Sequence, residues 1–339
     1  MNETEVILQN LNNPVEVEVE IVQVSSQEEL NQAFANFLSI DVAGGQASAD
    51  TLATYRLQVA RFVEWCMSVG IQPSQATTSD IKTYRRYLVD RGDKSSTIAL
   101  KLGVVRRFYQ AAVEKQVPGV SVNPATAVKA PLESIDPAER ITYLEKDELD
   151  LLLDTIPDDG TLIATRDRFM IALMAIEGPR TVELHRVNIG DIVRRGNDVG
   201  IQVQAKRSRR VVPLTARLAV RLEQYLELRR NLSGQELDPS EPLFISMDRA
   251  TSGQRLSRRG IRKRVDHYLT LANLKHAPGR TLTAHSLRHT AGTLGLRAGS
   301  TLRQVQDLLG HKNPQTTAIY VHINDRWKAN PGLGIDNKV

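Results

Sequence analysis

The sequence HSLRH occupies residues 285–289 and is followed by LGH at 309–311 and YVH at 320–322. The interpretation of this chain depends on these three short stretches. Arg288 follows His285 by 3 residues, His311 follows Arg288 by 23, and Tyr320 follows His311 by 9. Far upstream, residues 178–184 read GPRTVEL and add Arg180. Guanidinium groups bind phosphate oxygens in pairs, imidazoles exchange protons near neutral pH, and tyrosine carries a nucleophilic oxygen. The combination indicates a site for phosphate chemistry.

These side chains supply most of what is needed to break a phosphodiester through a covalent enzyme intermediate. Tyr320 is the predicted nucleophile, although a phenol with a pKa of about 10 must be activated by its surroundings. Arg180 and Arg288 are predicted to clamp the phosphate and neutralise the charge that builds on it. His285 and His311 are predicted to place and shuttle protons. Each residue alone has a plainer interpretation, such as an ion pair of Arg180 on its own helical turn.

The order of these motifs resembles that of the tyrosine recombinases, the phage-integrase family, over roughly residues 30 to 325. The resemblance implies a general acid, Lys206, in a β-hairpin just before residues 212–214 (VPL), which protonates the 5′-oxygen as it leaves. The hairpin turn is one residue shorter than in many members and lacks their usual Gly-Lys-Gly. Because Arg207 is adjacent, the general-acid position is open between Lys206 and Arg207.

Two features near the motifs qualify this interpretation. Family members usually have Gly-Leu-Arg or Gly-Met-Arg at the first arginine, whereas Pro179 intervenes here and is expected to set a helix start or a kink. His285 and His289 are four residues apart and could bind a metal from one helix face. However, this segment lacks the glutamate of a His-Glu-x-x-His zinc site and has no cysteine nearby. We therefore expect no metal and no cofactor, with His289 and His322 as packing or supporting residues.

Charge along the chain is uneven. The first 50 residues hold nine acidic side chains and no lysine or arginine, so residues 51–339 carry 44 basic and 30 acidic side chains, a net charge of +14. A body this basic suggests a polyanionic partner. No apolar run approaches the about 20 residues that span a bilayer, and no basic head precedes an apolar core at the N-terminus. Cys66 is the only cysteine, which fits a reducing compartment. We expect a cytoplasmic protein without membrane contact.

A length of 339 residues favours two domains. Apolar residues recur at helical spacing over 30–38, 52–63, 80–88 and 100–109, which predicts a four-helix bundle. Candidate helix caps are Ser26, Ser79 and Ser95–Ser96. Ten basic residues fall on the last three helices and predict either a surface that clamps DNA phosphates or ordinary solvated faces: Arg56, Arg61, Lys82, Arg85, Arg86, Arg91, Lys94, Lys101, Arg106 and Arg107.

The fold class expected is mainly α with a small β-sheet: a helical, SAM-like core-binding bundle followed by an α+β catalytic domain of the tyrosine-recombinase type. In the second domain, helices are predicted at 145–156, 162–177, 215–230, 256–274, 286–298, 301–309 and 314–319, with a hairpin at 199–204 and 210–214. The predicted parts are an acidic arm (1–28), the core DNA-binding domain (29–123), a linker (124–141), the catalytic domain (142–320) and a tail (321–339).

The resemblance implies a metal-independent, site-specific DNA recombinase that forms a 3′-phosphotyrosyl link. Its expected partner is double-stranded DNA with inverted half-sites, on which a homo-tetramer joins two sites and exchanges strands through a Holliday junction. Trp327 is a candidate anchor for a tail that docks on a neighbouring protomer. The alternatives are a type IB topoisomerase, a hairpin telomere resolvase, and a DNA-binding protein without catalysis. The sequence leaves open the target site, the need for accessory proteins, and the choice among integration, excision, inversion and resolution.

Overall fold

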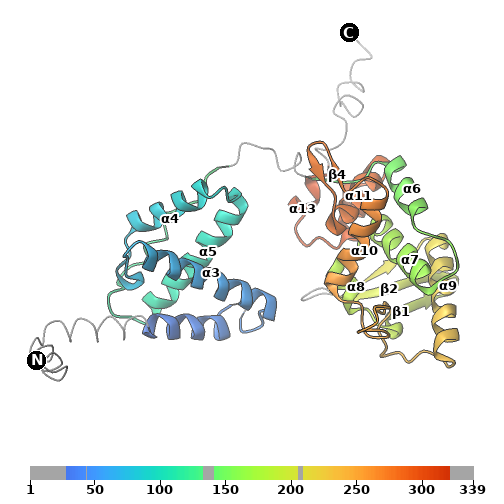
Figure 1. Cartoon of the computed structure of the whole chain (residues 1–339), viewed down its shortest axis with the longest axis horizontal. Coiled ribbons are helices and arrows are strands. Elements are labelled where there is room, and N and C mark those ends of the chain that lie inside the picture. Colours follow the sequence, from blue (N-terminus) through green and yellow to red (C-terminus); the bar gives the residue numbers. More distant parts are fainter. Residues whose placement is uncertain (1–27, 43, 133–140, 205–208, 321–339) are drawn as a thin grey trace, which may run out of the picture. The chain divides into compact units, whose positions relative to one another are not determined.

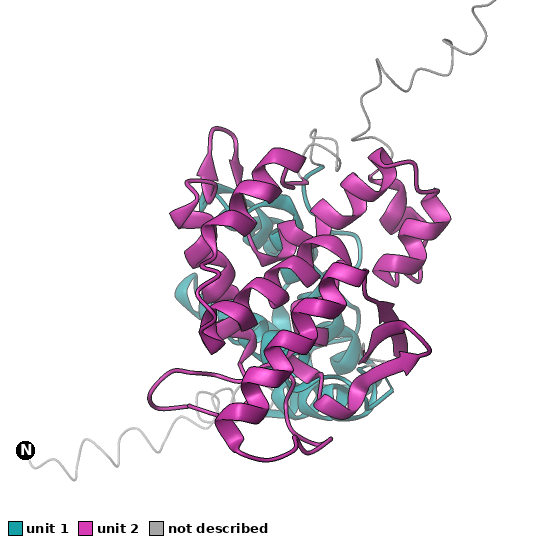
Figure 2. Cartoon of the chain, turned by 90° about the vertical axis from the view of Figure 1, so that its right-hand side faces the viewer, with its two compact units in different colours: residues 1–134 teal, residues 135–339 magenta. Residues whose placement is uncertain are grey.

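The computed structural model describes residues 28–42, 44–132, 141–204 and 209–320 (Figure 1). The chain divides into two compact units, residues 1–134 and 135–339, which are coloured separately in Figure 2. Helices dominate both units, and all strands in the described ranges lie in the second one. The predicted class, mainly α with a small sheet, is confirmed. Across the described ranges, no helix combines the length and apolar character needed to cross a membrane.

The first unit is a bundle of four helices packed around aromatic rings. It contains a helix over residues 28–40, then α3 (Ala49–Ser68), α4 (Thr78–Asp90) and α5 (Ser95–Glu114). Each helix contributes at least one buried ring to the centre, among them Phe34, Phe62, Tyr84 and Phe108. Phe62 lies edge-on to Tyr84 at 5.0 Å between centroids, and Phe34 lies edge-on to Phe108 at 5.4 Å. This geometry suits the charge distribution of aromatic rings, and the predicted four-helix bundle is present.

Two details of this unit differ from the predictions. Thr77, not Ser79, caps α4, because its backbone N–H donates to the Asp80 carboxylate at 2.8 Å and its hydroxyl accepts from the Asp80 N–H. Ser95 already lies inside α5. Lys101 is 4% exposed and paired with the Asp93 carboxylate at 2.5 Å, so it is an internal cation and not part of a DNA-facing surface.

The second unit is built around α7 (Leu162–Ile176), which is buried along most of its length and contacts α9 (Ala216–Ser233) and α11 (Ala284–Arg297). The remaining elements complete the unit around these three helices (Figure 1). They are α6 (Lys146–Thr155), α8 (Thr181–Arg186), η3 (Ile189–Asp191), β1 (Ile192–Arg195), β2 (Asp198–Gln204), β3 (Arg209–Pro213), α10 (Arg258–Leu271), β4 (His276–Ala277), β5 (Arg280–Thr281), α12 (Leu302–Leu309) and α13 (Gln315–Ala318).

The sheet is a three-stranded antiparallel meander in the order β1-β2-β3. The predicted hairpin is confirmed as β2 and β3, with Ile201 opposite Val212 and Gln204 opposite Arg209. Strand β1 was not predicted, and α8 was expected only as one of two outcomes at Pro179, without bounds. Both are short, and the two arginines that end β1 are exposed, so neither element produces a clear apolar period.

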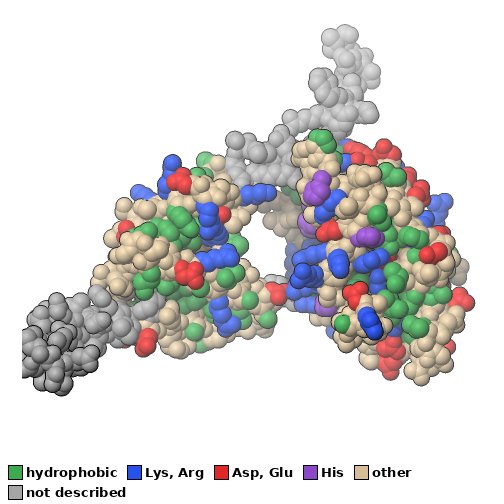
Figure 3. Space-filling model, viewed as in Figure 1, with side chains coloured by type: hydrophobic (Ala, Val, Ile, Leu, Met, Phe, Trp, Pro, Cys, Tyr) green, Lys and Arg blue, Asp and Glu red, His purple; other side chains and the backbone are tan. Residues whose placement is uncertain are grey.

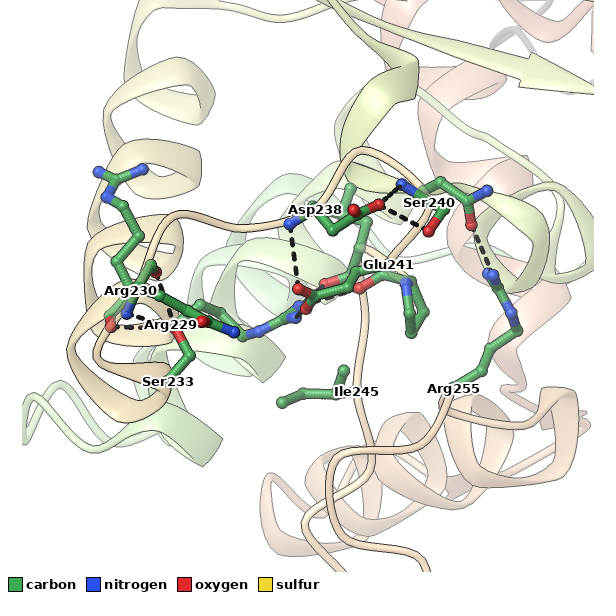
Figure 4. A network of polar contacts seen from close by, with 12 residues as sticks. Arg229, Arg230, Ser233, Asp238, Ser240, Glu241, Ile245 and Arg255 are labelled. Carbon is green, nitrogen blue, oxygen red and sulfur yellow. Dashed lines mark hydrogen bonds and ion pairs between the residues drawn. The ribbon is translucent and has the colours of Figure 1, made fainter.

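A polar network fixes the long connection between α9 and α10 (Figure 4). Arg229 donates to the carbonyls of Pro242 and Leu243 at 2.9 and 3.1 Å. Arg255 donates to the carbonyls of His185 and Val187 at 2.9 and 3.1 Å, at the C-terminal end of α8. These charge-assisted bonds to carbonyls hold the C-terminal end of α8 in place. The connection therefore supports the helix that Arg180 begins.

Candidate active site

Helix α11 carries the HSLRH motif. Thr283 caps it by accepting a hydrogen bond from the His285 N–H at 3.2 Å. His285, Arg288 and His289 follow at spacings that bring side chains onto one face of a helix. The rings of His285 and His289 lie 4.5 Å apart. Since α11 packs on the buried α7, the motif is presented on a rigid support.

Arg180 occupies the position just before α8, with its backbone extended at φ −72° and ψ 148°. Pro179 therefore precedes a helix start, which is the first of the two expectations for it. The Arg180 N–H donates to Glu183 at 2.8 Å, and its guanidinium donates to the same carboxylate at 2.9 Å. Its side chain keeps 35% exposure and lines an open cleft of about 540 Å³ together with Arg262 and His285. Arg180 thus has both the ion pair and an accessible cationic edge.

Glu183 links Arg180 to a second arginine that the sequence analysis did not single out. Arg210, on β3, donates to the fully buried Glu183 carboxylate at 3.0 Å and to the Leu308 carbonyl at 2.8 Å. Burial alone would raise the pKa of Glu183, but Arg210 and the Arg180 N–H outweigh it, so the pKa lies below its ordinary value. Arg210 thereby ties the hairpin strand to α8 and to the end of α12. A basic residue at an inward position of an alternating strand, two before Val212, is the signal that could have found it.

Arg288 is 2% exposed and bridges two backbone segments. Its two terminal nitrogens donate to the carbonyls of Gly178, just before Arg180, and of Leu309, just before His311. Burial lowers the pKa of Arg288 to about 10, with the charge of Arg180 acting in the same direction and Glu183 opposing both. The side chain is still a cation near neutral pH. It therefore binds the two loops that bear the other motif residues.

Tyr320 is 1% exposed and packs with Ala291, Val305 and Leu309. Its hydroxyl lies 2.8 Å from Nδ1 of His289. Burial raises the pKa of Tyr320 to about 12, although Arg288 and Arg180 act against that increase. The structure gives His289, expected only to support or pack, a direct contact with the predicted nucleophile.

His311 follows the left-handed Gly310 that ends α12. Its Nδ1 lies 2.8 Å from the Thr317 hydroxyl, and its ring is nearly parallel to that of Tyr320 at 6.4 Å. Burial, then the charges of Arg288 and Arg180, lower the pKa of His311 to about 4 and lower that of His285 as well. Both imidazoles are therefore neutral near pH 7 and can donate or accept one hydrogen bond at each nitrogen.

Five of the six predicted site residues thus lie just before α8, on α11 and along the chain from α12 to Tyr320: Arg180, His285, Arg288, His311 and Tyr320. Lys206 and Arg207 lie outside the described residues, between β2 and β3, as do His322 and Trp327. Among the described side chains, no group of three or more His, Cys, Asp or Glu is arranged to hold a metal ion.

Comparison with known proteins gives consistent results. The model of the phage integrase family matches residues 142–326, and that of the SAM-like N-terminal domain of phage integrases matches 32–116. The tyrosine recombinase XerC of Vibrio vulnificus strain YJ016 is 30% identical over 279 residues, covering 82% of each chain. XerC of Escherichia coli O127:H6 is 29% identical over 296 residues, covering 86% of this chain and 91% of that one.

Solved structures share the fold. The site-specific recombinase XerH, bound to a palindromic difH substrate, aligns with a TM-score of 0.68 at 20% identity, covering 84% of this chain and 80% of that one. A lambda integrase (75–356) dimer bound to a COC′ core site aligns with a TM-score of 0.62 at 18% identity. The alignment covers 84% of this chain and 96% of that one. The family match spans more than half of the chain and the XerC likeness covers most of it. The chain therefore belongs to the phage integrase family and is a tyrosine recombinase.

Proposed function

We propose that this protein is a site-specific DNA recombinase in which Tyr320 cuts DNA and Arg180 and Arg288 hold the phosphate that it attacks. The observation that carries this assignment is the convergence of one tyrosine, two arginines and two histidines just before α8, on α11 and on the chain that follows α12. The two arginines influence the same phenol, since both oppose the rise in its pKa. The Tyr320 hydroxyl also lies 2.8 Å from an imidazole nitrogen, so cations and a proton acceptor surround the same oxygen.

In the proposed reaction, the Tyr320 oxygen attacks phosphorus and forms a 3′-phosphotyrosyl bond as the bond to the 5′-oxygen breaks. The phenolic proton passes to a neutral imidazole or to water, and Lys206 protonates the leaving 5′-oxygen. Arg180 and Arg288 neutralise the charge that develops on the non-bridging oxygens. One phosphoester replaces another, so the energy of the bond is retained and the 5′-hydroxyl can religate by the reverse steps without ATP.

The surface around the cleft supports DNA as the substrate. Arg258 and Arg262, one turn apart at the start of α10, line the cleft beside Arg180 and His285. Figure 3 shows lysine and arginine side chains beside histidines on one face of the second unit. Clustered cations of this kind bind phosphates with strongly salt-dependent affinity. The basic surface of the first unit would add contacts to the DNA backbone, and we infer that the protein acts in the cytoplasm.

Assembly and the arrangement of the target are part of the same proposal. Structures of the same fold include a lambda integrase tetramer bound to a Holliday junction and XerH on a palindromic site. We infer a homo-tetramer on two DNA sites with inverted half-sites, exchanging strands through a Holliday junction. The catalytic domain is assigned to 142–320 and the core-binding domain to 29–123.

Covalent capture tests this function. Wild-type protein and the Tyr320→Phe variant are incubated with sheared DNA from the source organism and denatured, and the protein-linked DNA is sequenced. A single enriched site with inverted half-sites, lost in the variant, is the expected result. Scattered adducts that depend on Tyr320 would instead support a type IB topoisomerase activity. Absence of adducts from the wild type would contradict catalysis and favour a DNA-binding protein.

A further inference from the structure

The side of α11 that faces Tyr320 is shaped to receive its ring. His289 Nδ1 lies 2.8 Å from the phenolic oxygen. One turn further along the helix, Gly292 leaves space that no other residue would leave. A Cβ at this position would lie 3.0 Å from both Cε2 and Cζ of Tyr320 and 3.2 Å from a methyl of Leu309. The outer half of the ring therefore lies directly against the bare Gly292 backbone, with the hydroxyl directed at His289.

The hydrogen bond at this place has a defined direction. Burial, followed by the neighbouring His285, lowers the pKa of His289 to about 4, so the ring is neutral near pH 7. Since the pKa of Tyr320 is raised, the phenol keeps its proton. A protonated phenol donates and an unprotonated imidazole nitrogen accepts, so Tyr320 donates to Nδ1 of His289. Both groups are thus in the protonation state that makes the contact stable.

In this position Tyr320 cannot react with DNA. Its side chain is 1% exposed, whereas attack requires the phosphorus to approach the phenolic oxygen to about 3–3.5 Å. The ring must therefore leave the surface formed by His289 and Gly292 before cleavage. Leaving it breaks the bond to His289 and removes the ring from its contact with Gly292 and Leu309.

We propose that His289 and Gly292 are positioning residues that form a resting seat for Tyr320, and that release from this seat limits how fast the free protein can cleave DNA. The proposal rests on the assignment of Tyr320 as the nucleophile. His289 retains the seated tyrosine through its ring nitrogen, and Gly292 permits seating by its lack of a side chain. His289 acts through a hydrogen bond and Gly292 through the absence of a side chain. Because each is needed to hold Tyr320 in the seat, a change at either one should release the tyrosine.

Three variants and one control isolate the seat. His289→Ala removes the acceptor, and His289→Asn puts an amide acceptor near the place of Nδ1. Gly292→Ala adds a methyl group where the Tyr320 ring lies. Gly295→Ala is the matched control, because it lies one turn along on α11 and its Cβ would meet only a Val305 methyl at an ordinary 3.5 Å. Both glycine changes gain the same helix propensity, so their difference reports on the ring contact.

The first readout is the accessibility of Tyr320 without DNA. The proteins are treated with tetranitromethane, and nitrated tyrosine peptides are quantified by mass spectrometry. Tyr87, 41% exposed, and Tyr109, 1% exposed, serve as internal references for reactive and protected tyrosines. We expect Tyr320 to be protected in the wild type and in Gly295→Ala. In His289→Ala and Gly292→Ala it should be nitrated faster, in His289→Ala by about fivefold to tenfold, the ratio that corresponds to the net strength of one hydrogen bond. His289→Asn should restore most of the protection.

The second readout is the single-turnover rate of covalent adduct formation on a half-site oligonucleotide. His289→Ala and Gly292→Ala should form adducts faster than the wild type by a similar factor, with Gly295→Ala unchanged. Nitration that is equal in all variants would overturn the seat. An adduct rate that falls in His289→Ala while nitration rises would also overturn it, and would place His289 in the chemistry. If instead the wild type forms no Tyr320 adduct, the proposed function fails. The nitration result alone still tests whether His289 and Gly292 hold Tyr320.

Discussion

Tyr109 in the first unit and Tyr320 in the second are buried to the same extent and differ in what surrounds their oxygens. Each is 1% exposed. The Tyr109 hydroxyl donates to the Pro73 carbonyl at 2.8 Å, and the Tyr320 hydroxyl lies 2.8 Å from His289. In burial and hydrogen-bond length alone, the two phenols cannot be told apart.

Their electrostatic environments separate them. Burial raises the pKa of Tyr109 strongly, and its neighbours Cys66 and Asp80 raise it further. Burial also raises the pKa of Tyr320, but Arg288 and Arg180 act in the opposite direction and hold it at about 12. Tyr109 lies edge-on to the rings of Phe62 and Phe108, whereas Tyr320 lies in a group of cations and imidazoles. Burial therefore does not separate these two phenols, and Tyr109 lacks the guanidinium and imidazole groups that surround Tyr320.

The largest expected effect comes from removing each hydroxyl in turn. Tyr320→Phe should abolish covalent adduct formation on a half-site substrate, because no other oxygen lies in its place. Tyr109→Phe should keep the adduct rate and lower the free energy of unfolding by about 1 kcal/mol, the usual loss for one hydrogen bond. Adduct yield on denaturing gels and urea unfolding measure the two effects. A Tyr109→Phe variant that loses adduct formation while folded would break the comparison.

A second pair of variants compares the buried cations of the two units. Arg288→Lys keeps the charge and loses the planar fork, so the cleavage rate should fall about 100-fold. Lys101→Met leaves Arg91 as the remaining ion-pair partner of Asp93 and should cost about 1 kcal/mol in stability, with no change in the cleavage rate at saturating DNA. Single-turnover kinetics and urea unfolding of both variants are the measurements. Equal loss of cleavage in the two would show that a buried cation as such, in either unit, is what matters.

How far the sequence predicts this arrangement depends on the kind of signal. Arg180, His285, Arg288, His311 and Tyr320 were predicted because their residue types and order carry the resemblance, and they do converge. The helices of both units were predicted because their apolar faces have a clear period. These signals are local, so they survive without knowledge of the tertiary fold.

The rest depends on contacts between distant segments. Gly292 reads as an ordinary glycine in a helix until Tyr320, 28 residues later, is placed against it. Arg210 reads as one more surface charge until β3 meets α8 and the end of α12. His289 contacts Tyr320 only because the chain returns to α11 after α13. Short elements such as α8 and β1 lack the length to show a period at all.

Two glycines, Gly234 and Gly310, end helices in the same left-handed conformation and differ in what surrounds them. Gly310 has φ +62° and a Cβ there would lie 2.6 Å from Nε of Arg210, whereas Gly234 has φ +67° and open space around it. Gly234→Ala should cost only the backbone strain, about 1 kcal/mol. Gly310→Ala should cost about 1–3 kcal/mol more and lower cleavage about tenfold, because displaced Arg210 no longer holds Glu183. Thermal unfolding and cleavage rates measure the difference, and equal effects at the two sites would refute the role given to Arg210.

The smallest effect concerns pH. All seven histidines lie in the second unit. The pKa of His311 is about 4 in the folded protein against an ordinary value of 6.5. The unfolded chain therefore binds more protons between these values, so stability should fall as the pH falls from 6.5 towards 4. Burial raises the pKa of Glu177 to about 7 from its ordinary 4.5. The folded protein binds more protons at this carboxyl between these values, so Glu177 increases stability as the pH falls from 7 towards 4.5.

The useful measurement is therefore the difference in urea stability between wild type and His311→Asn at pH 7, 6 and 5. Because Glu177 is common to both proteins, its contribution cancels. The wild type should lose more stability than the variant as the pH falls. Parallel pH profiles would contradict the depressed pKa of His311.

The most direct test of the account is to identify the residue that becomes linked to DNA. Wild-type protein is trapped on a half-site substrate from which the cleaved strand diffuses away, then digested, and the nucleotide-bearing peptide is sequenced by mass spectrometry. We expect a single modified residue, Tyr320, with Tyr109 and every other tyrosine unmodified. A nucleotide adduct on any other residue, or an adduct that persists in Tyr320→Phe, would contradict it.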